Sequence, residues 1–113
     1  MIKLENTIKV LVPVTNNDGV KVDLSSEISA AVKIIGGATT YAARGSWVDD
    51  NKFYTDNINV MQFNCDGFDS DTVKVISELI YAIFSRAEQL AVSVEINGTF
   101  YILESVDDIK KLF

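Results

Sequence analysis

Residues 71–89 carry the clearest helical pattern of the chain, and this pattern constrains the fold more than any other feature. Apolar residues recur there with the 3.6-residue period of an α-helix, while charged and hydroxyl side chains fall mainly on the opposite face. Such a helix is stable chiefly when its apolar face is buried against another element. The apolar stripe consists of Val73, Ile76, Leu79, Ile80, Ile83, Phe84 and Ala87.

The segments around this helix alternate apolar and polar residues, as half-buried β-strands do. Asn97-Gly98 is the strongest short signal for a type I′ hairpin turn, and residues 49–52 predict a second hairpin loop. The strand pattern therefore covers residues 7–14, 38–48, 53–65, 91–96 and 99–103.

A shorter helix is predicted over residues 26–35, with Ser25 as its N-cap. Its apolar residues recur at helical spacing, and Gly36-Gly37 follows directly. A phosphate-binding loop needs glycines before a helix, where the backbone N–H groups are free. Because these glycines come after one, they predict a helix terminator in the left-handed conformation instead.

The elements follow in the order β-α-β-β-α-β, which is the order of the ferredoxin-like split βαβ fold. We therefore predict one α+β domain over residues 1–113, with both helices on one face of an antiparallel sheet. An extra C-terminal strand and a short terminal helix over residues 106–113 complete it, and Ser105 with Asp108 resembles a capping box for that helix.

The other face of the predicted sheet is expected to be polar, yet its pattern is partly apolar. Ile58 and Val60 lie on the face opposite Met61 and Phe63, and the strand before them places Tyr41 and Trp47 on one side. Apolar residues on both faces indicate that the second face is also covered. We expect a homo-oligomer, a dimer or higher, formed through the sheet.

Composition excludes several chemistries. A net charge of −6 disfavours a nucleic-acid binder, and no apolar run is long enough to span a membrane. The chain has no histidine and one cysteine, Cys65, so His-based nucleophilic systems and the usual zinc sites are not expected. We expect no metal and no cofactor. The start of the sequence lacks a signal-peptide pattern, so we expect a cytoplasmic protein.

The strand after Gly36-Gly37 carries the candidate ligand-binding residues. Tyr41 and Trp47 can stack on a base or pack on a partner subunit, and Arg44, among small residues, can bind a phosphate or carboxylate. Lys33 and Arg86 are candidate auxiliary cations. The alternative is that Tyr41 and Trp47 belong to the core or an interface, and that Arg44 pairs with an acid such as Asp56.

The stretch "GGATTYAARGSWVDDNKFYTDNINVMQF" and the later "LAVSVEINGTFYIL" resemble a family of small uncharacterised phage and prophage proteins. The resemblance covers about residues 34–103. It depends on a G-G-A-T, G-x-W and V-E-I-N-G pattern, carried here by residues 36–39, 45–47 and 94–98. It implies no catalytic residues.

Three functions remain open. The first is a non-catalytic phage-type protein that sequesters a small anionic molecule, such as a nucleotide signal of a host defence pathway. The second is a protein-interaction module that inhibits a host protein through its acidic surface. The third is a cofactor-free enzyme of the dimeric ferredoxin-like type, in which Tyr, Arg and Asp would act. The sequence nominates no general base, so no catalytic residue is predicted.

Overall fold

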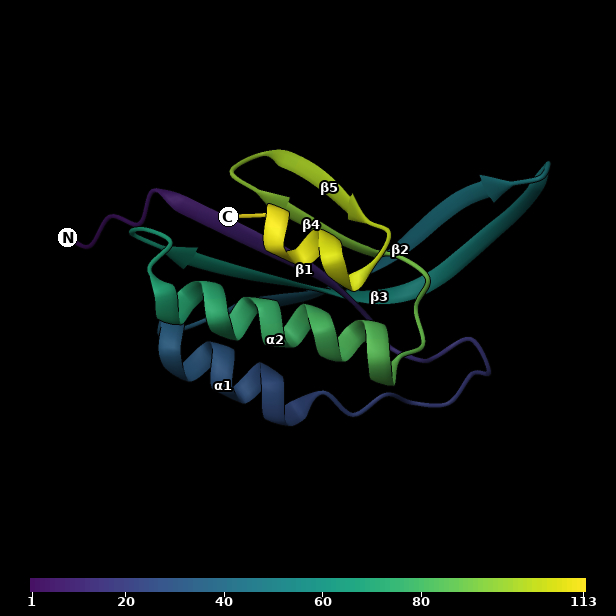
Figure 1. Ribbon diagram of the computed structural model, residues 1–113, viewed down its shortest axis with the longest axis horizontal. Helices are drawn as coiled ribbons and strands as arrows, with labels where there is room; N and C mark the ends of the chain where they lie inside the picture. The colour runs from purple at the N-terminus through teal and green to yellow at the C-terminus, as the bar shows by residue number, and fades with distance from the viewer.

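Five strands, two helices and one short 3-10 helix make up the computed structural model, which describes residues 1–113 (Figure 1). Neither helix is long and apolar enough to cross a membrane. In chain order the elements are β1 (Asn6–Pro13), α1 (Ser25–Ile35), β2 (Thr39–Asp49), β3 (Lys52–Cys65), α2 (Ser70–Arg86), β4 (Val92–Ile96), β5 (Thr99–Leu103) and the 3-10 helix η1 (Val106–Lys111).

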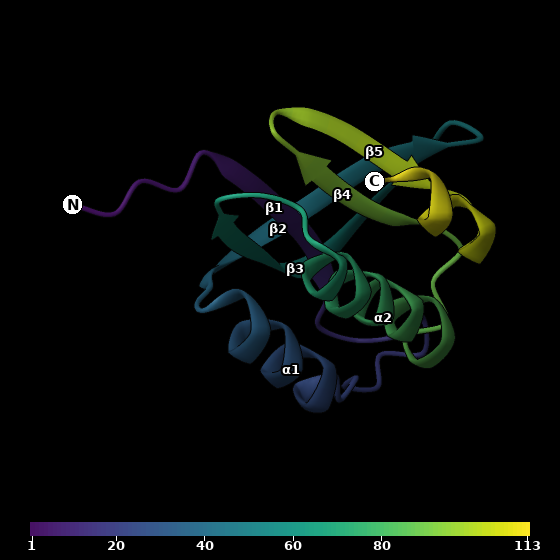
Figure 2. The ribbon, with the colours of Figure 1, turned by 60° about the vertical axis from the view of Figure 1, so that its left-hand side comes forward.

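The strands form one antiparallel sheet in the order β2-β3-β1-β4-β5. Strand β1 lies in the middle, where it separates β3 from β4, so each helix connects two strands that have a third strand between them. Figure 2 shows α1 and α2 side by side on one face of this sheet. The predicted ferredoxin-like arrangement, with an added β5 and terminal helix, is therefore confirmed.

Local sequence signals explain most of the helix ends. Gly36 ends α1 in the left-handed conformation with φ of 111°, and its N–H donates to the carbonyl of Val32 at 2.8 Å. At the start of α2, the Asp69 carboxylate accepts a hydrogen bond from the Thr72 N–H. The predicted Ser25 cap is wrong: Ser25 is the first helical residue, and the Asp23 carboxylate accepts from its N–H and its hydroxyl.

The hydrophobic core lies between the helices and the covered face of the sheet. It is one cluster of 20 buried residues, to which every strand except β2 contributes. Helix α2 supplies one continuous buried face, as its periodicity predicted. The largest fully buried side chains are Phe63, Ile8, Ile76, Leu79, Ile80, Ile83, Val10 and Val94.

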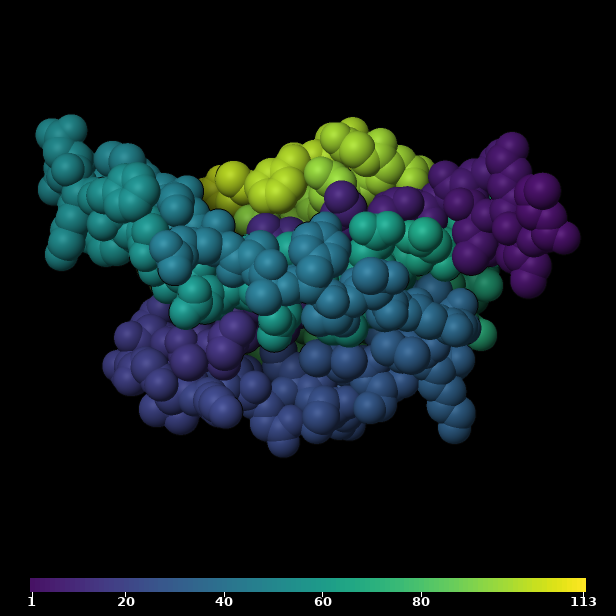
Figure 3. Space-filling model, turned by 180° about the vertical axis from the view of Figure 1, so that it is seen from behind, coloured from purple at the N-terminus to yellow at the C-terminus, as the bar shows by residue number.

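Strands β2 and β3 extend past the rest of the sheet as a two-stranded arm. The pairing of β1 with β3 stops at Pro13 and Ile58, with one further hydrogen bond from the Val14 N–H to the Asn57 carbonyl; beyond it, β2 and β3 pair only with each other. Asp50 and Asn51 form the turn, with φ of 50° and 62°. Seen from behind, the arm stands out at the end of the molecule opposite the N-terminal segment (Figure 3).

Candidate functional site

Of the five residues predicted to bind a ligand, the three on β2 are divided between the two faces of the sheet. Tyr41 and Trp47 lie on the open face, the one without helices, while Arg44 lies on the helix side of the arm. Arg44 is paired in register with Asn57, whereas Asp56 is opposite Gly45 on the other face. The alternative interpretation of an Arg44–Asp56 ion pair is therefore wrong.

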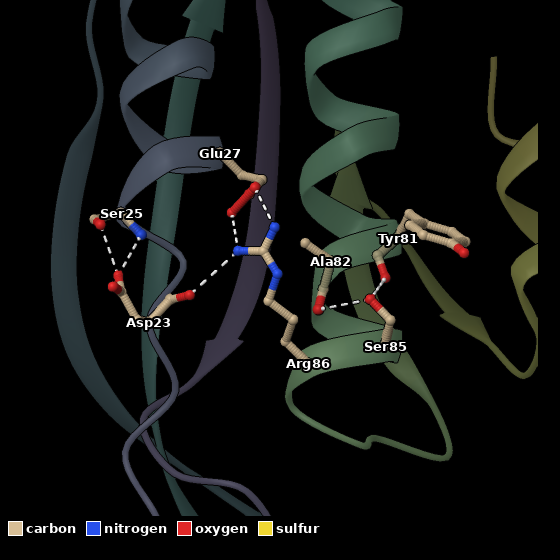
Figure 4. A network of polar contacts seen from close by, with 7 residues as sticks. All are labelled: Asp23, Ser25, Glu27, Tyr81, Ala82, Ser85 and Arg86. Atoms are coloured by element: carbon tan, nitrogen blue, oxygen red, sulfur yellow. Dashed lines mark hydrogen bonds and ion pairs between the residues drawn. The ribbon is translucent and has the colours of Figure 1, made fainter.

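The two auxiliary cations lie on the helix side. Arg86 ends α2 and makes a bidentate contact with Glu27 of α1, with both N–O distances at 2.6 Å (Figure 4). It also donates to the backbone carbonyl of Asp23. Lys33 is exposed in the last turn of α1. Arg86 thus joins two helices, and neither cation shares a face with Tyr41.

The open face holds a charged pair that the sequence analysis did not single out. Lys9 of β1 and Glu95 of β4 are cross-strand neighbours, and their Nζ and Oε2 atoms are 3.3 Å apart. Both side chains are about one-third exposed, at 31% and 30%. Each is the only charged residue of its strand, and this was the one sequence feature that could have pointed to the pair.

A polar hollow of about 420 Å³ surrounds this pair. Hydrogen bonds engage two of its lining side chains, Asn97 and Gln62. The side-chain oxygen of Asn97 accepts from the Thr7 N–H at 2.9 Å, and Gln62 donates to Asn64 at 3.1 Å. The lining contains no hydrophobic residue and consists of Glu5, Thr7, Lys9, Gln62, Glu95, Asn97 and Gly98.

The pKa of Lys9 is raised above its ordinary value. The largest cause is its hydrogen bond to Glu95, followed by the charge of Glu95 and a contribution from the nearby Tyr41. Lys9 is therefore a permanent cation near neutral pH and cannot act there as a base. The negative charge that it contacts in this structure is that of Glu95.

Next to the polar hollow, the open face becomes apolar. Leu11, Val60 and Tyr41 occupy adjacent positions on three strands, and Val60 is only 7% exposed although no helix covers it. Farther out on the arm, Trp47 stacks on Tyr54 with ring centroids 5.5 Å apart. The open face thus offers a charged end, an apolar strip and an aromatic end.

A larger hollow of about 780 Å³ lies on the helix side, between α2 and η1. Three of its polar side chains are engaged already: Arg86 pairs with Glu27, and the Ser85 hydroxyl donates to the Tyr81 carbonyl (Figure 4). Apart from these it is lined by Val73, Ser77, Glu78, Ala82, Val106, Ile109, Lys110 and Phe113. Ser77, Glu78 and Lys110 leave polar groups free in this hollow, which shares no residue with the polar hollow on the open face.

No protein-family model and no curated protein matches the chain in sequence. Two solved structures match its fold over 93% of this chain and 95% of theirs. One is a phage SAM lyase in complex with S-methyl-5'-thioadenosine, with a TM-score of 0.64 and 17% identity. The other is a phage SAM lyase in the apo state, with a TM-score of 0.59 and 14% identity.

At these identities the comparison establishes the shared fold. It also contradicts the first expected function, a non-catalytic protein that sequesters a nucleotide signal, because the neighbours in fold are enzymes. Two coarser expectations agree with it: both neighbours are phage proteins, and one of them holds a small nucleoside ligand.

Proposed function

We propose that this protein is a lyase that cleaves a cationic adenosyl sulfonium compound of the SAM class. The observation that carries the proposal is the match in fold, over nearly the whole of both chains, to a phage SAM lyase that holds S-methyl-5'-thioadenosine. The resemblance in sequence to small phage and prophage proteins supports the same origin. We therefore propose that this protein is also encoded by a phage or prophage.

The proposed reaction breaks the bond between the sulfonium sulfur and the aminobutyrate chain. The bonding electron pair goes to sulfur, so the cation becomes the neutral thioether of methylthioadenosine and needs no acid catalyst. The carbon chain regains electrons either from its own carboxylate, which closes a lactone, or from a neighbouring C–H bond, whose proton then goes to a base. Both routes balance without water, metal or redox cofactor.

This chemistry suits a chain without histidine. The reaction loses charge at sulfur, and a site of low polarity favours a step that removes charge. The apolar strip of Leu11, Val60 and Tyr41 offers such surroundings. The net charge of −6 also favours the approach of a cation over that of the anionic nucleotide expected from Arg44.

We further propose that a second copy of the chain covers part of the open face and the arm. Val48 and Phe53 near the tip of the arm are 64% and 68% exposed, and Phe100 and Ile102 of β5 are 52% and 61% exposed. Exposed apolar side chains of this size in a single chain favour an interface with another copy of the chain. Light scattering coupled to size exclusion tests this: we expect a homo-oligomer, and a monomer at micromolar concentration would contradict it.

The test of the activity is incubation of the purified protein with SAM, with the products separated by chromatography and identified by mass. We expect SAM to disappear and S-methyl-5'-thioadenosine to accumulate in equal amount. S-adenosylhomocysteine is the matched control and should stay intact, because its sulfur is already neutral and leaves poorly. Recovery of intact SAM after prolonged incubation would overturn the proposal.

A further inference from the structure

The Lys9–Glu95 pair differs in setting from the other ion pairs of the molecule. Lys3–Glu5 is highly exposed near the N-terminus, Lys111–Asp108 joins neighbouring turns of η1, and Arg86–Glu27 joins the two helices. Lys9 and Glu95 instead lie within the sheet, on the face that no helix covers, and the surrounding hollow has only polar lining. No packing in the single chain requires charges at these positions.

We propose that this pair recognises the zwitterionic amino-acid end of the substrate. The Lys9 ammonium would bind the substrate carboxylate, and the Glu95 carboxylate would bind the substrate ammonium. A free amino acid carries these two charges on one carbon, so it matches a lysine and a glutamate whose charged atoms are 3.3 Å apart. The inference rests on the proposed function and assigns one part of its substrate to named residues.

The lining of the hollow supplies further groups of the kinds that such a head group needs. Gln62 is the cross-strand neighbour of Lys9 on β3, and Thr7 lies two residues before Lys9 on β1; both side chains can donate and accept hydrogen bonds. A volume of about 420 Å³ is ample for an amino-acid head group. Because the lining contains no hydrophobic residue, an adenosine ring would gain little by occupying this end.

The position of the apolar strip then sets the direction of the bound substrate. Lys9 and Leu11 lie on the same face two residues apart, which separates them by about 7 Å along the strand. A substrate with its head group at Lys9 and Glu95 would extend over Leu11 and Val60, and its adenosine would reach Tyr41 and the arm. The charged end is thereby held in a polar site while the sulfonium lies over apolar surface, where loss of its charge is favoured.

The inference predicts which ligands the protein distinguishes. Calorimetry would measure the Kd of the unmodified protein for three ligands that the proposed lyase does not consume. They are S-adenosylhomocysteine, its decarboxylated form, which lacks the carboxylate, and S-methyl-5'-thioadenosine, which lacks the whole amino-acid end. Loss of one charge-assisted contact should weaken binding of the decarboxylated form about tenfold or more relative to S-adenosylhomocysteine. Equal affinity for these two ligands would overturn the role of Lys9 without any variant having to fold.

Two variants complete the test. Lys9→Met and Glu95→Gln should each raise the KM for SAM and the Kd for S-adenosylhomocysteine about tenfold or more, while the Kd for S-methyl-5'-thioadenosine stays within about twofold. Lys111→Met, which removes the lysine of an ion pair on η1, is the matched control and should leave these constants unchanged. Circular dichroism and thermal unfolding would verify that each variant is folded.

Failure of this inference is distinguishable from failure of the proposed function. If the unmodified protein cleaves SAM but both variants bind and cleave it like the parent, the lyase proposal stands and the assignment of Lys9 and Glu95 is wrong. If the variants weaken the binding of S-adenosylhomocysteine and of S-methyl-5'-thioadenosine equally, the pair does not recognise the amino-acid end. If the unmodified protein neither binds nor cleaves SAM, the proposed function itself fails.

Discussion

The same strands form both faces of the sheet, but the side chains on the two faces differ in chemical character and burial. On β3, Met61 and Phe63 face the helices and are buried, while Gln62, between them, faces the open side. The buried part of the covered face is apolar and belongs to one core cluster. The open face carries an ion pair, an apolar strip and an aromatic stack within a few residues of each other. Folding of one chain requires the first face to be apolar, but it requires neither the apolar strip nor the aromatic stack on the second face.

This difference shows where function can be sought in a small α+β protein. Residues on the covered face are selected by volume and packing, so a substitution there changes stability. Residues on the open face do not have to fill the core, so their chemical character indicates which kind of ligand the face binds. The following predictions separate the two faces, from the largest expected effect on the protein to the smallest.

Truncation of the core should have the largest effect. Phe63 is completely buried between the sheet and the helices, and Phe63→Ala should lower the free energy of unfolding by about 3–5 kcal/mol. Urea denaturation followed by circular dichroism measures it. Gln62→Ala, which truncates the neighbouring side chain of β3 on the open face, is the matched control and should cost less than about 1 kcal/mol. Equal losses would show that the two faces do not differ as described.

Truncation of Tyr41 should affect activity more than stability, the reverse of the effect expected for Phe63→Ala. It lies on the open face beside Lys9, so Tyr41→Ala should lower kcat/KM for SAM roughly tenfold or more, the scale of one lost stacking contact, with little change in unfolding. Tyr41→Phe keeps the ring and removes the hydroxyl. Activity of the phenylalanine variant close to that of the parent would assign the effect to stacking, and unchanged activity of Tyr41→Ala would exclude Tyr41 from the site.

Asp69 should affect stability in a pH-dependent way. Hydrogen bonds from Thr72 lower the pKa of the Asp69 carboxyl, so the unfolded chain binds its proton more readily than the folded one. The stabilisation is therefore present above the ordinary pKa of about 3.8 and is lost as the pH falls through the lowered value.

Urea midpoints at pH 7 and pH 3 test this. At pH 7, Asp69→Ala should lower the midpoint by roughly a quarter of the Phe63→Ala effect. Asp69→Asn, which retains a capping side chain, should lose less at pH 7, and its midpoint should fall less between pH 7 and pH 3 than that of the parent. An identical fall in the parent and Asp69→Asn would show that another carboxyl dominates, such as Asp23 or Asp108, whose pKa values hydrogen bonds also lower.

Arg86 should have the smallest effect on activity. Its contact with Glu27 is bidentate but solvent-exposed on the arginine side, so Arg86→Ala should change the urea midpoint only slightly. Because the pair lies on the helix side, kcat/KM for SAM should stay within about twofold of the parent value. A strong loss of activity in a folded Arg86→Ala variant would instead support the ligand-binding role that the sequence predicted for it.

Much of the fold followed from local patterns. The period of α2, the Asn97-Gly98 turn and the glycine terminator at Gly36 each act over a few residues, so they are visible in the sequence. The faces of β2 were also predictable, because alternation alone separates Tyr41 from Arg44. Ser25 was misassigned because Asp23, two residues earlier, accepts the hydrogen bonds at that helix start.

The candidate site was less visible because its parts come together only in the sheet. Lys9 and Glu95 are far apart in the chain, and only the register between β1 and β4 makes them neighbours. The enzyme interpretation ranked last because the sequence offers no strong general base. A sulfonium releases a neutral thioether, which is a good leaving group without protonation, so a lyase acting on it does not need a histidine to protonate that group.

The most direct test of the central claim is a crystal structure of the protein with S-methyl-5'-thioadenosine bound. The account predicts the ligand on the open face, with its adenine near Tyr41 and its thioether over Leu11 and Val60, leaving the hollow around Lys9 and Glu95 free for the missing amino-acid end. Binding of the ligand in the larger hollow between α2 and η1 would contradict the account.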